Sequence, residues 1–234
     1  ECSGKRPNAN MCSSFLTGNT KTVIISATAP DVDGTFLAGF NEKDFRPDEH
    51  RIISFGSCTV HPGVILIDFM HRHFGVEACT VNIIHSVSQW QIDAKLFNTL
   101  RRRPCSLEWV APRFFNFLGD GKLKVNYTLV PFGGVSTFDF AFTVKKKVDV
   151  ETILNAVEID MATGGSLENL IGLVPTDNGP DAHLRSPLSA SIVESHIDVR
   201  AATVHLFCYS FNEGSSIQLH KLACHIINEF AKQR

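Results

Sequence analysis

The chain has 234 residues, of which 44% are hydrophobic and 20% charged, and its formal net charge at pH 7 is -2. That length can bury a real core as one large domain or two small ones, and the composition argues against disorder. The near-zero charge argues against nucleic acid or an anionic membrane as a partner, and no apolar run reaches membrane-spanning length.

Seven cysteines are scattered along the chain without a C-x-x-C motif, and their number is odd. This usage predicts free thiols in the cytoplasm or another reducing compartment, without disulfides or structural zinc. We recognise no secretory signal peptide. The chain begins at Glu1 rather than Met, so it remains open whether the sequence is part of a longer protein. His71 and His73 are two residues apart on a predicted helix and face different ways, which predicts no metal site.

The first part of the chain predicts short strands and one buried helix. Residues 21–26 are an apolar, β-branched run typical of a parallel strand, and residues 35–40 and 51–55 predict two more strands around a polar turn. A helix that is apolar on more than one face is predicted over residues 63–74. A long strand is predicted next, over residues 78–88.

The second part predicts an antiparallel sheet with one covered face. Residues 122–129 and 136–144 alternate between apolar and polar, with Phe138, Phe140 and Phe142 on one side. Further elements are predicted as a helix over residues 150–162 capped by Asp149, strands at 170–174, 191–194 and 202–211, and a final helix capped by Ser215 or Ser216. The order predicts an α+β fold, with a mixed, largely antiparallel sheet and helices on one face, attached to a remnant of an α/β domain.

One turn and one strand carry residues suited to chemistry. Cys58 lies between a predicted strand and a predicted helix, near the positive end of the helix dipole, which favours thiolate over thiol. His85 is the single histidine of the long predicted strand. A cysteine and a histidine on neighbouring elements are the minimum set for covalent catalysis at a carbonyl.

Several short segments occur in the order that they have in one enzyme family. They are Glu1-Cys2-Ser3-Gly4, Val23-Ile24-Ile25-Ser26-Ala27, Ile52 to Thr59, His85-Ser86-Val87-Ser88, Gly121-Lys122-Leu123 and Asn212-Glu213. Over nearly its whole length the chain resembles the glyceraldehyde-3-phosphate dehydrogenase family. The resemblance implies a truncated Rossmann-type remnant over residues 1–57, a catalytic-domain-like part over 58–211, and a C-terminal helix over 212–234 that packs back on the remnant.

The resemblance also implies roles for particular residues. Cys58 takes the place of the nucleophile that forms a thiohemiacetal and then a thioester, and His85 that of the base. Asn212 takes the place of the asparagine that holds the nicotinamide amide. The positions that correspond to phosphate-binding groups are Ser57, Thr59, Ser88 and Ser106.

Departures from the family pattern affect ligand binding. Trp90 replaces a phosphate-binding threonine, and Leu129 replaces an arginine, the natural bidentate phosphate clamp. The segment between Gln91 and Pro104 is shorter than the family's S-shaped loop, which argues against the family tetramer and leaves a dimer open. No G-x-G-x-x-G occurs, so we expect no bound cofactor in the chain as it stands, and NAD only if a missing half precedes Glu1.

Three functions remain open at this point. The first is a non-catalytic homologue kept as a structural or assembly subunit with a protein partner, and without a specific nucleic acid or membrane partner. The alternative is an active NAD-dependent phosphorylating aldehyde dehydrogenase that uses Cys58 and His85. A third is cofactor-free thiol chemistry at the same pair. Candidates for a partner surface are Trp90, Trp109 and the cluster of Phe114, Phe115 and Phe117, with ordinary core packing as the alternative.

Overall fold

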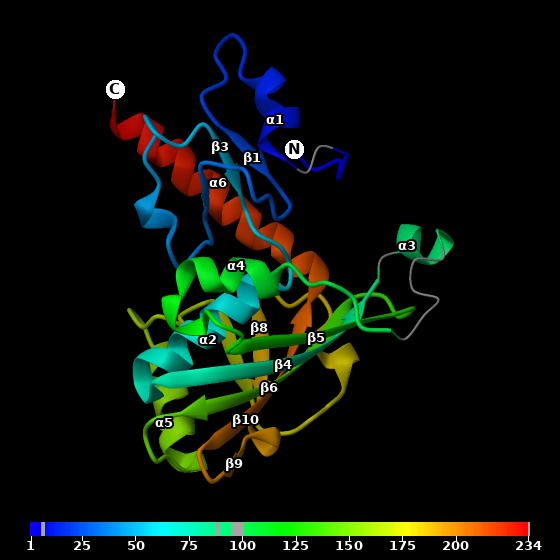
Figure 1. The fold of residues 1–234 in the computed structure, drawn as a ribbon, viewed down its shortest axis with the longest axis vertical. Coiled ribbons are helices and arrows are strands. Elements are labelled where there is room, and N and C mark those ends of the chain that lie inside the picture. The colour runs from blue at the N-terminus through cyan, green and yellow to red at the C-terminus, as the bar shows by residue number, and fades with distance from the viewer. Residues whose placement is uncertain (6–7, 88, 95–100, 234) are drawn as a thin grey trace. The chain divides into compact units, whose positions relative to one another are not determined.

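The computed structural model describes residues 1–5, 8–87, 89–94 and 101–233 (Figure 1). These residues form two compact units, one of residues 1–57 and 215–234 and the other of residues 58–214. None of the helices described is long and apolar enough to cross a membrane. The same residues contain no group of three or more His, Cys, Asp or Glu side chains that could hold a metal ion.

The first unit holds a small parallel sheet. Its strands are β1 (Val23–Ile25), β2 (Gly34–Thr35) and β3 (Ile52–Ser54), in the order β1-β3-β2. The strands predicted at residues 21–26 and 51–55 are confirmed, but the strand predicted at 35–40 is wrong beyond its first residue. The Asn41 side chain binds the Thr35 oxygen and the Leu37 nitrogen, which folds this segment into a turn.

Helices pack on this sheet and complete the first unit. They are α1 (Ala9–Cys12), the 3-10 turns η1 (Ser13–Phe15) and η2 (Glu42–Asp44), and α6 (Ser215–Lys232). One apolar cluster joins Leu222 and Ile226 of α6 to Ile53, and a second joins Cys12 of α1 to Ile25. Burial in both clusters explains why the strands are continuous apolar runs rather than alternating ones.

The second unit is built on a mixed, largely antiparallel sheet. Its strands are β4 (Val76–Ser86), β5 (Leu123–Val130), β6 (Val135–Val144), β7 (Ile171–Val174), β8 (Ala190–Val193), β9 (Asp198–Arg200) and β10 (Thr203–Phe211). The order is β5-β4-β6-β10-β8-β7, with β9 paired to β10. Among the strands described in this unit, only the pairs β4–β5 and β7–β8 are parallel. The prediction of a mixed, mostly antiparallel sheet is therefore confirmed, although β4 separates the two consecutive alternating strands.

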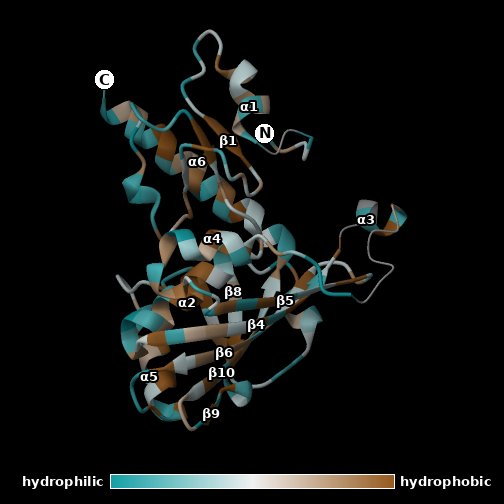
Figure 2. Cartoon of the chain, in the orientation of Figure 1, coloured by the Kyte–Doolittle hydropathy of each residue, from teal (hydrophilic) through white to brown (hydrophobic). Residues whose placement is uncertain are grey.

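Helices and turns complete the second unit. They are α2 (Val60–Phe74), α3 (Gln89–Asp93), α4 (Leu107–Phe114), α5 (Val150–Met161), and the 3-10 turns η3 (Asn116–Leu118), η4 (Pro180–His183), η5 (Glu194–His196) and η6 (Asn212–Gly214). The middle of α2 is apolar and its last turn polar (Figure 2). Phe138, Phe140 and Phe142 stack in the core, with ring centroids 6.0 and 5.1 Å apart, so the predicted covered face of this strand is confirmed.

A glycine is required at position 165, just after α5. A Cβ atom on Gly165 would lie 2.2 Å from the backbone oxygen of Asp160, which also accepts the N–H of Leu167 at 2.9 Å. We expect Gly165→Ala to lower the free energy of unfolding by about 2 kcal/mol in urea titrations, because backbone must move to admit the methyl group. Gly133→Ala is the control, since its Cβ atom meets nothing within 4 Å. Equal losses in the two variants would contradict this explanation.

Candidate functional site

The structure brings Cys58 and His85 into contact. Cys58 directly precedes Thr59, the N-cap residue of α2, and His85 lies near the end of β4. The Sγ atom of Cys58 is 3.2 Å from Nε2 of His85. At this distance the thiol can donate its hydrogen to the imidazole, so the pair has the geometry of a nucleophile and its base.

The electrostatics of the pair oppose ionisation. Burial, the largest cause, raises the pKa of the Cys58 thiol to about 12; the nearby Cys105 and Glu213 also raise it, while the backbone N–H groups of Cys58 and Thr59 lower it. Burial lowers the pKa of His85 to about 4. At neutral pH both groups are therefore uncharged. The helix dipole predicts a lowered pKa for Cys58, and this prediction is wrong. The pKa is raised because desolvation of the thiolate outweighs the backbone N–H donors at the start of α2.

The surroundings of His85 leave its second ring nitrogen unused. Nδ1 of His85 is buried and makes no hydrogen bond to any residue that the structure describes. Catalytic imidazoles are commonly fixed in one tautomer by a hydrogen bond at this second nitrogen. The ring of Tyr127 lies 5.5 Å away, and the buried Leu129 is the partner of His85 in the β4–β5 register. No carboxylate therefore orients His85 within the described part of the chain.

Two of the four predicted phosphate contacts lie together. Oγ1 of the buried Thr59 is 3.4 Å from Oγ of Ser106, and the Cys105 thiol donates to the same Thr59 oxygen at 3.6 Å. Ser57 is half-buried and belongs to the first unit, whereas Thr59 and Ser106 belong to the second. Ser88 and the side chain of Trp90 lie outside the described residues.

Sequence reasoning missed Tyr127, whose ring lies 5.5 Å from that of His85, and Arg103, which pairs with Tyr127. Their backbones form an antiparallel bridge, with Arg103 N donating to Tyr127 O at 2.9 Å. Burial raises the pKa of Tyr127, and the positive charge of Arg103 acts against that shift. A signal was present in the sequence, because Tyr127 is two residues from Leu129 and therefore shares its face of the strand.

Asn212 is held by residues of its own unit. Its Nδ2 donates to the backbone oxygen of Ser86 at 2.8 Å and to Oγ of Ser86 at 2.6 Å, and its Oδ1 accepts from Oγ of Ser136 at 2.7 Å. Oγ of Ser136 in turn accepts the N–H of Ser86 at 3.1 Å. The side-chain amide thus ties together the ends of β4, β6 and β10, and its donor and acceptor are both engaged.

This network predicts a stability role for Asn212. We expect Asn212→Asp to lower the free energy of unfolding at pH 7 by about 2 kcal/mol, because a carboxylate oxygen would replace the donor that faces the Ser86 oxygens. Urea titration measures the loss, and Asn155→Asp on the exposed side of α5 is the control. If the two variants lose the same amount, the network is not what stabilises this corner.

The aromatic cluster after α4 divides between core and surface. Phe115 is buried, and the ring of Phe117 stacks on His71 with centroids 3.6 Å apart. Trp109 is 38% exposed, with the guanidinium of Arg113 5.5 Å from its ring. Core packing therefore accounts for Phe115, while Trp109 remains a candidate for a partner surface.

The chain was compared with models of known protein families. None matches. The resemblance to the glyceraldehyde-3-phosphate dehydrogenase family therefore stays a prediction from the residues.

Proposed function

We propose that this chain is a divergent glyceraldehyde-3-phosphate-dehydrogenase-like protein that no longer catalyses the reaction and serves as a structural or assembly subunit. The observation that carries the proposal is the engagement of Asn212. Its amide, which would have to hold a nicotinamide, has its donor and its acceptor bonded to Ser86 and Ser136. Binding a nicotinamide there would break contacts that join three strands.

The charge state of the Cys58–His85 pair supports the same proposal. A thiol with a pKa of about 12 is ionised in roughly one molecule in 10⁵ at pH 7. A thiolate is the nucleophile in thiohemiacetal formation, so a neutral Cys58–His85 pair supplies very little of the reactive species.

The absence of an arginine at position 129 also supports the proposed loss of catalysis. The buried side chain of Leu129 stands beside His85, where the resemblance implies an arginine. Loss of one charge-assisted contact at a transition state commonly costs about 3 kcal/mol, or roughly a hundredfold in rate.

A role in assembly accounts for a retained fold without a retained site. Function then depends on surfaces rather than on the inherited pocket. The surface of the chain would then bind a protein partner. We place the subunit in the cytoplasm or another reducing compartment because all seven cysteines are free thiols.

A second candidate is an active NAD-dependent phosphorylating aldehyde dehydrogenase. The 3.2 Å contact between Cys58 and His85 favours it. In that case Cys58 Sγ attacks the aldehyde carbon while Nε2 of His85 takes the thiol proton, so that no free thiolate is needed beforehand. The engaged Asn212 amide does not fit the nicotinamide that this reaction also needs.

Three measurements separate the two candidates. The chain is titrated calorimetrically with NAD and assayed with glyceraldehyde 3-phosphate and inorganic phosphate, and it is isolated from its natural source under mild conditions. We expect no heat from NAD, no turnover, and a stoichiometric complex with another protein. Micromolar NAD binding with turnover that Cys58→Ser abolishes would establish the dehydrogenase instead.

A further inference from the structure

The segment that contains α4 is much more basic than the rest of the chain. Residues 101–113 hold four arginines, one glutamate and no lysine, whereas the whole chain has a formal net charge of -2. The tryptophan of this segment, Trp109, is 38% exposed. Arginine and tryptophan are enriched at protein–protein interfaces and their binding hot spots, whereas lysine is depleted there. The composition of this segment is therefore typical of a protein interface.

Specific contacts hold two of these arginines in place at the surface. Nε of Arg102 donates to the backbone oxygen of Val125 at 3.0 Å, and its guanidinium pairs with the Glu108 carboxylate, yet the side chain is still 51% exposed. The guanidinium carbon of Arg113 lies 5.5 Å from the ring centroid of Trp109, and both side chains are exposed. Because these side chains are already ordered, they lose less conformational entropy when a ligand binds.

The exposed side chains of α4 and of the turn before it form one surface, which is called the α4 patch. It consists of Arg101, Arg102, Trp109 and Arg113. Glu108 joins Arg102 to α4, and Trp109 is the next residue of the helix. Arg113 follows Trp109 by four residues, so the two side chains are neighbours on one helix face. The α4 patch therefore offers three guanidinium groups beside one indole ring.

We propose that the α4 patch binds an acidic segment of a partner protein, with carboxylates on the guanidinium groups and an apolar side chain beside Trp109. The proposal rests on the assembly role above and names the surface and the kind of partner. The planar guanidinium group binds a carboxylate through two parallel hydrogen bonds, which fixes the orientation of the segment. Complementary charge also speeds association and disfavours partners of like charge.

A single-stranded nucleic acid fits the α4 patch less well. Proteins bind such strands by stacking successive bases on aromatic faces along a basic groove. The α4 patch has one aromatic ring, that of Trp109, and the Arg113 guanidinium already lies over it. Outside residues 101–113 the chain is net acidic, so a long polyanion would meet like charge on either side of the patch.

A second copy of the chain is disfavoured by charge. A two-fold axis through the α4 patch would place the same surface of both copies together, with Arg101, Arg102 and Arg113 of one copy against those of the other. Like charges brought together across an interface oppose association. The charge of the α4 patch therefore favours a different, acidic protein.

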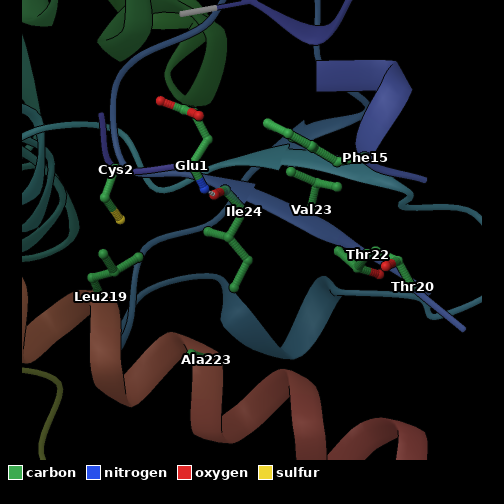
Figure 3. Close-up of a pocket in the computed structure, with 9 residues that line it drawn as sticks. All are labelled: Glu1, Cys2, Phe15, Thr20, Thr22, Val23, Ile24, Leu219 and Ala223. Carbon is green, nitrogen blue, oxygen red and sulfur yellow. Dashed lines mark hydrogen bonds between the residues drawn. The ribbon is translucent and has the colours of Figure 1, made fainter. Parts of the chain in front are cut away.

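The groove of about 570 Å³ beside β1 offers no comparable selection of a partner (Figure 3). The nitrogen of Glu1 donates to Ile24 O at 2.7 Å, so the chain itself takes a place on that strand edge. Apart from Glu1, the described residues that line the groove are uncharged. Charge complementarity therefore points to the α4 patch and not to this groove.

A labelled acidic peptide tests the proposal. The probe is the fluorescein-labelled, amidated peptide Glu-Glu-Leu-Glu-Asp-Leu-Glu-Glu, and the readout is fluorescence anisotropy. We expect saturable binding that weakens about tenfold or more from low to high salt, because exposed charges are screened. The same peptide with Gln and Asn in place of Glu and Asp should not bind. No saturable binding of the acidic peptide, or equal binding of the uncharged one, would overturn the proposal.

Two matched pairs of variants locate the binding site. Arg113→Glu should weaken binding of the acidic peptide at least about tenfold, whereas Arg200→Glu makes the same change of charge on a side chain that is 79% exposed in β9 and should have little effect. Trp109→Ala should weaken binding, and Phe132→Ala, at a side chain that is 71% exposed, should not. Equal effects within either pair would overturn the proposal. If Arg113→Glu unfolds, Arg101→Gln at an exposed position decides.

Further outcomes separate the α4 patch from the assembly role. If the chain isolates with a partner that Arg113→Glu does not release, the assembly role stands and the patch proposal fails. If the chain turns over NAD and has no partner, the assembly role fails, and the peptide titration still decides the patch. Tighter binding of a short oligouridylate than of the acidic peptide would identify a nucleic acid as the occupant. A dimer that Arg113→Glu dissociates would identify a second copy, and either result overturns the proposal.

Discussion

Cys58 is expected to react with iodoacetamide at pH 7 about a thousand times more slowly than a thiol with an unshifted pKa. Burial moves the pKa of Cys58 from 9.0 to about 12, and a shift of three units lowers the thiolate fraction at neutral pH about a thousandfold. Only the thiolate is alkylated at a useful rate, so the rate follows this fraction. Because the group gains reactivity by losing a proton, its labelling rate should rise about tenfold per pH unit and level off only near pH 12.

Peptide-resolved mass spectrometry measures this rate with a control inside the same molecule. Cys224 is exposed and should be labelled long before Cys58. His85→Gln should leave the slow rate at Cys58 nearly unchanged at pH 7, since a neutral imidazole does not hold a thiolate by charge. Fast labelling of Cys58 at pH 7 that His85→Gln abolishes would show an ionised pair and contradict the proposed loss of catalysis.

His85 is expected to make the protein sensitive to acid. Its pKa is 6.5 when unfolded and about 4 when folded, because burial disfavours the charged imidazole. Between these pH values the unfolded chain binds more protons than the folded one, so stability falls as the pH drops. The whole effect of this one group amounts to about 3 kcal/mol, present above pH 6.5 and lost by about pH 4.

A comparison of two pH series isolates this effect. The free energy of unfolding is measured by urea titration from pH 8 to pH 4 for the unaltered protein and for His85→Gln. The difference between the two proteins should be constant above about pH 7 and change by up to about 3 kcal/mol in favour of the variant at pH 4. Parallel curves over the whole range would mean that His85 is charged, or solvated, in the folded state.

Features that depend on near neighbours could be predicted from the sequence. The cap of α5 is confirmed, with Asp149 Oδ1 accepting the Thr152 N–H at 2.9 Å, because capping involves residues three positions apart. The covered face of β6 is also confirmed, since alternation directly reports which side of a strand is buried. Alternation carries no information on strand order, so the position of β4 between β5 and β6 was not predicted.

The two reactive residues of the candidate site could be predicted, but the side chains and hydrogen bonds that surround them could not. Cys58 and His85 were singled out, and they meet at 3.2 Å. The residues that surround them, Tyr127 and Cys105, were not identified as part of the site. The partners of Asn212 lie 76 and 126 positions away in sequence, so the side-chain network emerges only when three strands end side by side.

Local patterns in the chain were enough to predict most helices and strands, the largely antiparallel character of the main sheet, and the thiol and imidazole of the candidate site. The order of the strands, the hydrogen bonds of Asn212 and the direction of the Cys58 pKa shift became known only from the folded chain. Propensity, capping and alternation act over a few residues. Desolvation and long-range hydrogen bonds depend instead on which distant segments pack around a group.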